Sequence, residues 1–585
     1  MEAVNGRSGM YVKQTRLKNG TVNVSIVQAY WQDGRSRSRT IRGLGRLDLL
    51  DAEHGDGLTW AKNLCEELGQ KAADEAKAVP IDIYPKQKID KRSQNIKNIG
   101  CVIPLAYYNS LGIEKTLRNH ALGRRFDFDV NAVARLLVTD RMVSPGSKLS
   151  AFGEKDSYFF RTDFGEDDVY RSLDFISECK DALVSAINRT IGKRHERNLK
   201  DAYYDVTNYY FEIDDEDKLR RNGVSKEKRR KPIVQLGLLQ DADGIPLNFD
   251  VFAGNTNDCE TMLPIMRNAR RDLGIRRVVM VADKGLNTSS NIAACTLDGN
   301  GFVFSQSIRG TKSPEELRRW VISEDGYRTR PDDEGGPGFK IKSRQDSKVI
   351  HIESDEGKTK DVEVEVKVVA FWSAKYDHRA KVERAKVLAK AEALVKNPSS
   401  YDRAIHYGVA RYIKGLVVDK KTGEVKTEAG CVPVMDTELI AEEEHLDGYY
   451  CIVTSEYGLA DEKIVDIYRG LWRIEEAFKV TKSHLKSRPV YVRTPKHIRA
   501  HFLICYVALV IIRLIQKDTG YQHSAGAILS EIAQLNGIHL HGNWWRFYHR
   551  TNLSDELAQL TGVDLSRANM QLTDIKKLLK KPEKG

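Results

Sequence analysis

The sequence lacks the features that mark membrane, exported and metal-thiolate proteins. Its longest apolar run, residues 502–512, is shorter than the roughly 20 residues that a membrane-spanning helix requires, and we expect it to form a buried helix. The N-terminus has no basic start followed by an apolar stretch, so we expect no export signal. The eight cysteines include no C-x-x-C pair of the zinc or redox type. These absences favour a cytoplasmic protein with free thiols and no membrane partner.

Charged residues are abundant and biased toward the positive sign. Lys and Arg number 93 against 82 Asp and Glu, which gives a formal charge of +11 over 585 residues. With 41% hydrophobic residues, the composition is typical of a soluble globular protein. A positive surface concentrates phosphate backbones near a protein, so the balance favours a polyanionic partner. Charge alone is a weak signal, because many basic proteins bind no nucleic acid.

Changes of pattern along the chain predict several domains. Residues 1–85 are predicted to form a β-rich unit with basic outward positions, because strands alternate with a period of two around turns at 19–20 and 33–34. Residues 86–199 are predicted to be helical; a DNA-binding region and a helical packing domain fit this pattern equally well. The remaining predicted segments are a mainly β insertion domain and a helical C-terminal region, at 310–455 and 501–585.

Residues 200–309 and 456–500 are predicted to form one catalytic core. The first part contains three strands, then a helix, a strand, a helix and a strand, at 202–213, 233–239, 245–252, 260–274, 278–282, 289–299 and 302–307. Three strands joined by hairpins and followed by helix-linked strands match the α/β, ribonuclease H-like arrangement of a mixed sheet. In that arrangement the first and fourth strands are neighbours.

Two aspartates occupy these neighbouring strands. Asp205 lies inside the first strand, and Asp283 directly follows the fourth. A carboxylate within an apolar strand is costly unless it is paired or bound to metal. Two carboxylates on adjacent strands can share a hard cation such as Mg²⁺. The structural alternatives are a buried or turn-capping role for Asp205 and an ordinary strand-end turn for Asp283.

A third acidic residue is predicted on a single helix over residues 462–486. At about 100° per residue, Glu475 points about 70° from the centre of the apolar stripe, and Glu476 about 170° from it. We therefore expect Glu475 to reach over the sheet edge and Glu476 to face water. Residues 477–499 contain seven basic residues and no acid, which favours phosphate binding.

Three phrases of the sequence resemble the blocks of bacterial insertion-sequence transposases of the DDE type. They are YYDVTNYYFE at 203–212, VADKGL at 281–286 and YRGLWRIEEAFKVTKSHLK at 468–486. The third is similar to a group with a Tyr-x2-Arg-x3-Glu-x6-Lys signature and a β-rich insertion. Tyr468, Glu475 and Lys482 match three of its four positions. Leu471 stands at the arginine position, so Arg469 or Arg473 would have to supply that phosphate contact.

The resemblance implies a function and a set of site residues. The protein would bind double-stranded DNA at the ends of its insertion sequence, as a homodimer associated with the bacterial nucleoid. Asp205, Asp283 and Glu475 would hold two Mg²⁺ ions, for which Mn²⁺ can substitute, during hydrolysis and strand transfer. The implied DNA contacts are Tyr468, Arg473, Lys479, Lys482, Lys486 and Arg488. Relatives that cut the second strand through a DNA hairpin stack it on an aromatic of the insertion; Trp320 and Trp372 are the candidates.

Two other functions remain open at the level of the sequence. One is a ribonuclease H-like DNA nuclease that cuts without joining. The other is a catalytically idle protein that binds DNA as a repressor. A serine hydrolase is disfavoured, because the sequence has no G-x-S-x-G elbow.

Overall fold

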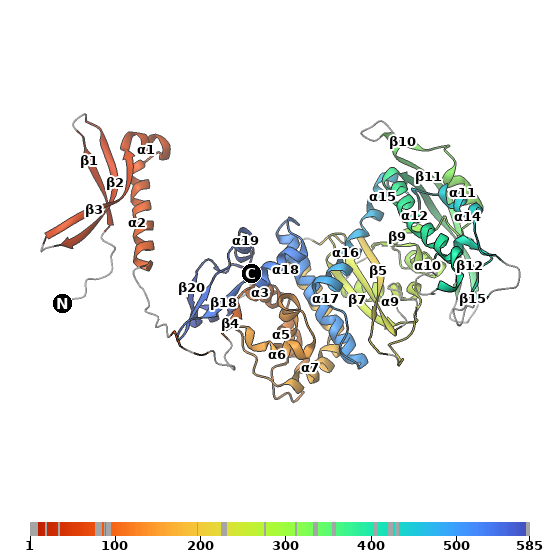
Figure 1. The fold of residues 1–585 in the computed structure, drawn as a ribbon, viewed down its shortest axis with the longest axis horizontal. Helices are drawn as coiled ribbons and strands as arrows, with labels where there is room; N and C mark the ends of the chain where they lie inside the picture. Colours follow the sequence, from red (N-terminus) through yellow and green to blue (C-terminus); the bar gives the residue numbers. More distant parts are fainter. Residues whose placement is uncertain are drawn as a thin grey trace. The chain divides into compact units, whose positions relative to one another are not determined.

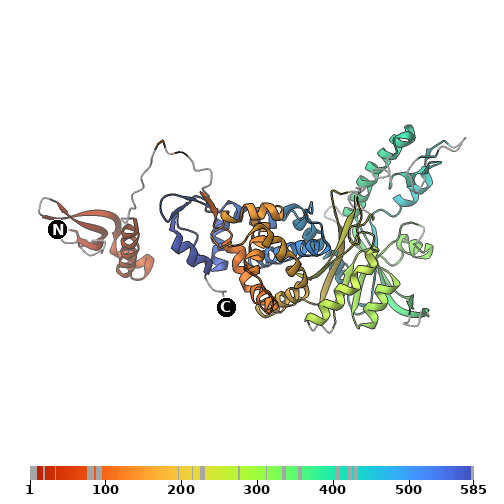
Figure 2. The same cartoon turned by 90° about the horizontal axis from the view of Figure 1, so that it is seen from below.

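The protein folds into two compact units, residues Met1–Lys91 and Arg92–Gly585, which are described separately here (Figures 1 and 2). In the computed structural model, the described residues are 10–17, 20–32, 35–75, 85–86, 88, 95–195, 197–213, 215–223, 231–273, 277–310, 313–331, 337–353, 359–401, 408–418, 425–426 and 432–580. The predicted turn at 33–34 and most of the turn at 19–20 lie outside these residues. The boundaries of the six predicted segments stay a prediction.

The N-terminal unit is a three-stranded antiparallel sheet followed by two helices. Its elements are β1 (Met10–Arg16), β2 (Val22–Gln32), β3 (Arg35–Arg46), α1 (Leu47–His54) and α2 (Gly57–Glu75), with β2 in the centre of the sheet. A small core forms where Val24 of the sheet meets Leu50 of α1 and Ala61 of α2. The alternating pattern predicted for this region therefore does form strands.

The larger unit is built on a nine-stranded mixed sheet, as expected of a ribonuclease H-like catalytic domain. Its strands are β5 (Asp201–Tyr210), β6 (Ile233–Asp241), β7 (Pro246–Ala253), β8 (Val279–Ala282), β9 (Gly301–Gln306), β10 (Arg328–Pro331), β11 (Pro337–Glu353), β12 (Thr359–Ser373) and β17 (Tyr449–Thr454). Their order is β10-β11-β12-β17-β9-β8-β5-β6-β7. The first core strand, β5, pairs in parallel with the fourth, β8, which confirms the predicted neighbours.

The core strands are mostly buried, because both faces of the sheet are covered. Every residue of β6 is buried, as expected for a strand between two layers of helices. At Gly237, in β6, a Cβ atom would lie 2.3 Å from the Tyr204 hydroxyl oxygen, so only glycine fits. The helices of this part are α9 (Asp258–Leu273) and α10 (Ser289–Leu297).

The longer strands of residues 310–455 extend the core sheet instead of forming a separate one. β17 pairs with β9, β12 with β17, and β11 with β12. In the described residues they are accompanied by the helices α11 (Glu315–Ile322), α12 (Ala374–Lys396) and α14 (Thr437–Glu444). Two short ladders complete this part: β13 (Ile413–Lys414) with β16 (Val434–Met435), and β14 (Val417–Val418) with β15 (Val425–Lys426). The insertion is thus physically continuous with the core.

A helical layer surrounds one long buried helix, α17 (Pro495–Asp518). By length and composition α17 could cross a membrane, but 94% of its most apolar window is buried inside the protein. It packs on α5, α7 and β7, so it is the core helix of this unit (Figure 2), and the prediction of a buried helix at 502–512 is confirmed. The surrounding helices are α3 (Val102–Ser110), α4 (Ile113–Ala121), α5 (Val130–Val143), α6 (Lys148–Gly153), α7 (Glu166–Glu178), α8 (Lys180–Arg194) and α18 (Ala525–Gln534).

The C-terminal region contains strands as well as helices, so its prediction as helical was only partly correct. A four-stranded sheet joins β4 (Ile96–Asn98) to β18 (Asn536–His539), β19 (Trp544–Phe547) and β20 (Asn569–Gln571). Strands of three or four residues are too short to display a period of two. The helices here are α19 (Asn552–Thr561) and α20 (Leu572–Lys580).

Buried polar side chains hold the segment that follows the predicted signature helix. Arg141 donates to the carbonyl oxygens of Leu485 (3.3 Å) and Lys486 (3.1 Å). The Nε2 atom of His501 lies 3.0 Å from the Ser487 carbonyl oxygen, and its Nδ1 lies 3.5 Å from Lys148 Nζ. Three consecutive carbonyls are therefore fixed by α5 and α17.

Replacing Lys148 by methionine is expected to change how stability depends on pH. Burial lowers the pKa of Lys148 from 10.5 to about 7. Between these two pH values Lys148 is therefore protonated in the unfolded chain and neutral in the folded protein. The free energy of unfolding then rises with pH, by up to about 1.4 kcal/mol per unit for one such group. Urea unfolding at about pH 7 and about pH 9 should show a smaller rise in Lys148→Met than in the unmodified protein.

The exposed Lys193 provides the control for this experiment. Lys193→Met should keep the pH dependence of the unmodified protein. Parallel stability curves for Lys148→Met and the unmodified protein would show that Lys148 is charged in the fold.

Candidate active site

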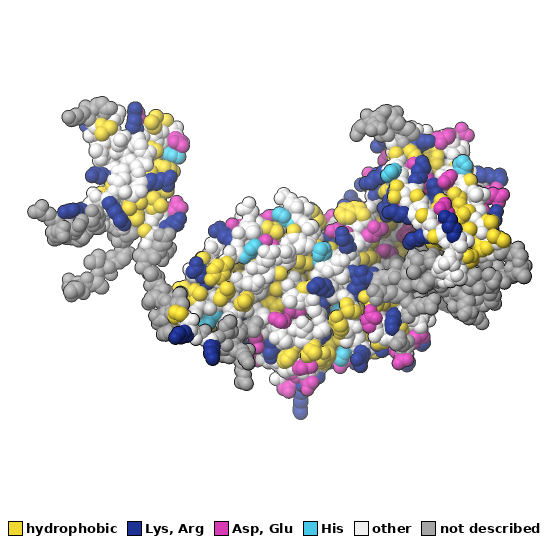
Figure 3. All heavy atoms as spheres, in the orientation of Figure 1, with side chains coloured by type: hydrophobic (Ala, Val, Ile, Leu, Met, Phe, Trp, Pro, Cys, Tyr) yellow, Lys and Arg dark blue, Asp and Glu magenta, His cyan; other side chains and the backbone are white. Residues whose placement is uncertain are grey.

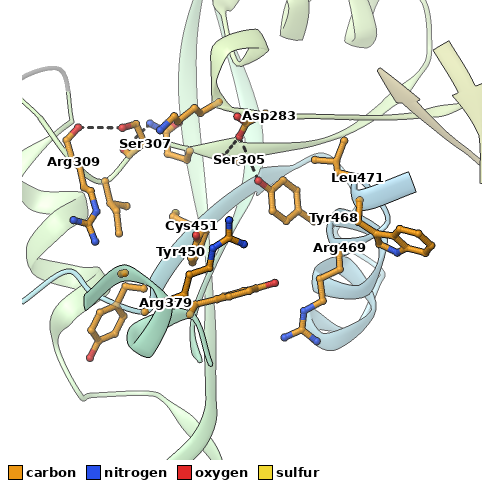
Figure 4. Close-up of a pocket in the computed structure, with 18 of the residues that line it drawn as sticks. Asp283, Ser305, Ser307, Arg309, Arg379, Tyr450, Cys451, Tyr468, Arg469 and Leu471 are labelled. Carbon is orange, nitrogen blue, oxygen red and sulfur yellow. Dashed lines mark hydrogen bonds between the residues drawn. The ribbon is translucent and has the colours of Figure 1, made fainter. Parts of the chain in front are cut away.

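The three acidic residues predicted from the sequence line one cavity of about 540 Å³ in the larger unit. Asp205 comes from β5, Asp283 follows β8, and Glu475 lies on the helix that runs from Trp472 to Lys479, α16. Residues of α12, which belongs to the insertion, also line the cavity. Part of its lining is drawn in Figure 4. Residues separated by more than 190 positions therefore share one site.

The register of the parallel strands places the two aspartates at the same level. Tyr203 of β5 pairs with Val281 of β8, and each aspartate comes two residues later. Asp283 accepts hydrogen bonds from the Ser305 hydroxyl (3.3 Å) and the Tyr468 hydroxyl (3.4 Å), as Figure 4 shows. Because the carboxyl ends of parallel strands lie at one edge of a sheet, both carboxylates reach the same cavity.

The predicted single helix over 462–486 is broken, and this corrects the expectation. It consists of α15 (Asp461–Arg469), α16 (Trp472–Lys479) and a wider π-helical turn (Val480–His484). The break falls at Gly470, where a Cβ atom would lie 2.2 Å from the Tyr203 hydroxyl oxygen. That hydroxyl donates to the Ile467 carbonyl oxygen at 3.1 Å. A close approach of β5 therefore separates α15 from α16.

The break also changes the surroundings of the two glutamates. Glu475 is exposed and lines the cavity. Glu476 was expected to face water, and this was wrong: it is half-buried and accepts a hydrogen bond from Arg513 at 3.0 Å. Arg513 is a buried residue of α17. The ion pair with Arg513 holds Glu476, and with it α16, against the core, whereas Glu475 lines the cavity.

The donor set suits a hard divalent cation. Carboxylate oxygens are the ligands that Mg²⁺ and Mn²⁺ take up in proteins, and the three acids supply them from three separate elements. Within the described part of the chain, no three His, Cys, Asp or Glu side chains lie close enough together to enclose a metal ion. The acids therefore share a cavity without forming a closed coordination shell, and their chemistry fits the ion.

Two of the predicted DNA contacts lie close to the acids. Tyr468 lines the cavity and is half-buried; burial, and then the negative charge of Asp283, raise the pKa of its hydroxyl. Lys482 donates to the Thr207 hydroxyl at 2.7 Å and lies 5.1 Å above the Tyr209 ring. Thr207 is two residues beyond Asp205 in β5, so Lys482 lies beside the strand that carries Asp205. It does not line the cavity itself.

The other predicted DNA contacts lie on α16 and in the segment that follows the π-helical turn. The Arg473 guanidinium lies 5.2 Å from the Trp472 ring. Lys479 and Lys486 are exposed, and Arg488 is half-buried. Lys486 adopts the left-handed backbone conformation with φ of 42°, which turns the chain directly after the signature residues.

The insertion contributes cavity residues that were not predicted. Arg379 and Tyr376 of α12 and Tyr450 of β17 line the cavity, as does Arg309 just before the insertion, and Figure 4 shows Arg379, Tyr450 and Arg309 among the lining residues. Arg379 Nε donates to Glu383 at 2.8 Å. This hydrogen bond and, to a smaller extent, the negative charge of Glu475 raise the pKa of the Arg379 guanidinium. The sequence of 374–396 did not predict that this helix lines the cavity, because a helix that only faces solvent has the same charged pattern.

Neither tryptophan proposed for hairpin stacking lines the cavity. Trp320 packs beneath Lys342 and Arg344, whose charged groups lie 4.9 and 4.8 Å from its ring. Trp372 Nε1 donates to the Asp447 carbonyl oxygen at 3.0 Å. Trp472 does line the cavity, and it is 55% exposed. The hairpin role stays a prediction.

Comparison with known families now places the chain. A model of the transposase DDE domain matches residues 213–511, just over half of the 585 residues. The chain belongs to the DDE transposases of insertion sequences. A model of the N-terminal domain of IS1634 family transposases matches residues 12–79, so the resemblance seen in the sequence is confirmed. Of the three acids in this transposase, Asp283 and Glu475 lie inside the matched DDE range, and Asp205 lies just before it.

A curated relative agrees with this placement over a short stretch. The putative transposase for insertion sequence element IS4SA of Synechocystis sp. (strain ATCC 27184 / PCC 6803 / Kazusa) is 35% identical over 65 residues. That stretch is 11% of this chain and 19% of the relative. The transposase described here therefore spans about a fifth of the length of that relative.

Proposed function

We propose that this transposase binds the ends of its insertion sequence and catalyses metal-dependent cleavage and strand transfer, of the cut-and-paste type. The observation that carries the proposal is the convergence of Asp205, Asp283 and Glu475 on one open cavity. Membership of a DDE transposase family supports it. The cofactor would be Mg²⁺, with Mn²⁺ as a substitute.

Each side chain of the cavity has a role in this proposal. Asp205, Asp283 and Glu475 would hold the divalent ions, which when bound supply Lewis-acid stabilisation and activate the attacking oxygen. The Tyr468 hydroxyl, which donates to Asp283 at 3.4 Å, would orient that carboxylate and face the phosphate. Arg379 lines the same cavity and would neutralise charge on the phosphate during the in-line attack.

The proposed partner is double-stranded DNA, both as transposon end and as target. Its backbone would be positioned, without reading of bases, by Lys482 beside β5 and by the cations Arg473, Lys479, Lys486 and Arg488. The transposase would act as a homodimer in the bacterial cytoplasm, on the nucleoid. A role of residues 86–199 in DNA binding belongs to the same proposal.

An assay with purified protein, Mg²⁺ and duplexes of the terminal sequences tests the proposal. Joined products are the expected result. Cuts without joining would favour a ribonuclease H-like nuclease, and retention of DNA without cutting would favour a repressor. Either outcome would contradict strand transfer as the activity of this chain.

Replacing Arg379 by glutamine is expected to slow cleavage by about 10- to 100-fold, because a cation facing the reacting phosphate is lost. The reaction rate at saturating DNA is the quantity to measure. Lys375→Gln, in the same helix, removes an exposed charge that does not line the cavity. A loss of equal size in both variants would show that α12 acts only through its general charge.

A further inference from the structure

The N-terminal unit has its charges strongly segregated between sheet and helices. Its three described strands carry seven basic residues and no acidic one. Helices α1 and α2 carry seven acidic residues and only two lysines. On the face seen in Figure 3, Lys and Arg side chains outnumber acidic ones over this unit. Surface charge normally mixes signs, so the sheet is suited to a polyanion.

In the part of the sheet that the structure describes, one side continues as a ribbon of two strands, β2 and β3. Among the described residues, β1 pairs with β2 only as far as Met10 opposite Gln28. Beyond that pair, β2 and β3 continue together over 29–32 and 35–38. Four residues at about 3.4 Å each give an arm of about 14 Å. The major groove of DNA, about 12 Å wide, admits a ribbon of two strands.

Arginines of β3 follow a period of two along this arm and at its base, where Arg39 pairs with Gln28. Arginine alternates with serine at 35–39, so Arg37 and Arg39 point to the same face of the ribbon. Both are exposed. The Arg39 guanidinium is oriented by two hydrogen bonds to Gln28 Oε1, at 3.1 and 2.8 Å. Serine on the other face is small enough to let a backbone approach closely.

We propose that the β2–β3 ribbon enters the major groove of double-stranded DNA, with Arg37 and Arg39 against the groove wall and its phosphates. This inference rests on the proposed function only in taking DNA as the partner. The main element that docks on DNA would then be the N-terminal sheet and not the helical region at 86–199. Strands in a groove are an established mode of DNA reading.

The test compares two double variants of the full-length protein that lose the same charge from the same unit. Arg37→Gln/Arg39→Gln removes the ribbon arginines, and Lys62→Gln/Lys71→Gln removes two exposed lysines of α2. Binding is measured by fluorescence anisotropy against salt, with a duplex of the terminal sequence and a shuffled duplex. The ribbon variant should bind at least about tenfold more weakly, and its salt slope should fall by about 2.

The lysine variant should keep the affinity and the salt slope of the unmodified protein. Equal losses in both variants, or an unchanged slope in the ribbon variant, would overturn the proposal and return DNA docking to the helical region. If the ribbon variant unfolds early, Arg37→Lys/Arg39→Lys should retain the slope, since it keeps the charge. Failure of the transposase to cut any DNA would sink the proposed function, while this binding measurement would still decide the role of the ribbon.

Discussion

Replacing Asp205 by asparagine should abolish DNA cleavage, with a rate at least about 10³-fold below that of the unmodified protein. This factor corresponds to about 4 kcal/mol of lost transition-state stabilisation. Asparagine keeps the shape of the side chain but removes the charge that a divalent cation requires. Gel analysis of cleaved end duplexes gives the rate, and anisotropy gives the affinity for DNA, which should change by less than about twofold.

The same strand offers a control for this substitution. Asp201 also lies in β5 but does not line the cavity. Burial raises the pKa of Asp201, so neutralising it is tolerable for the fold. Asp201→Asn should cut normally, whereas Asp283→Asn and Glu475→Gln should fail like Asp205→Asn. Undiminished cleavage by any of the three cavity variants would refute its assignment as a metal ligand.

Replacing Arg197 by methionine should destabilise the larger unit by about 3–5 kcal/mol, because it leaves a buried carboxylate without its partner. Arg197 Nε donates to Asp241 at 2.8 Å, and the two side chains are only 3% and 0% exposed. Arg197 also donates to the Asn188 side chain (2.6 Å) and the Pro246 carbonyl oxygen (2.7 Å). It thereby joins α8 to β6 and β7. Urea unfolding measures the loss.

The loss should depend on pH in a defined direction. Burial already raises the pKa of Asp241, and removing Arg197 raises it further. A carboxyl whose pKa is higher in the folded state loses stability as pH rises, so Arg197→Met should be less damaging at about pH 5 than at about pH 8. The double variant Asp241→Asn/Arg197→Met should recover part of the stability. A loss below about 1 kcal/mol, or no recovery, would contradict the ion pair as a structural element.

The sequence was sufficient to predict the order of the core strands and the meeting of the two aspartates. The strands of this part are rich in β-branched and aromatic residues, and parallel strands present their carboxyl ends at one edge. That rule brings Asp205 and Asp283 together without any knowledge of side-chain packing. The buried helix at 502–512 was predictable for a similar reason, since its apolar run is local.

The site features that escaped prediction depend on contacts between distant segments. The break at Gly470 exists because Tyr203 approaches it, and the two lie more than 260 positions apart. Glu476 is held by Arg513 of α17, which no helical wheel of one segment can reveal. Arg379 reaches the cavity because β12 and β17 extend the core sheet and α12 follows β12 directly. Local patterns contain none of this information.

Diffraction at the manganese edge, from crystals of the full-length transposase with a terminal duplex and Mn²⁺, tests the central claim most directly. The expected result is anomalous density in the cavity, in contact with Asp205, Asp283 and Glu475 and with the phosphate at the end of the element. Manganese bound elsewhere, with the DNA phosphate outside this cavity, would contradict the account.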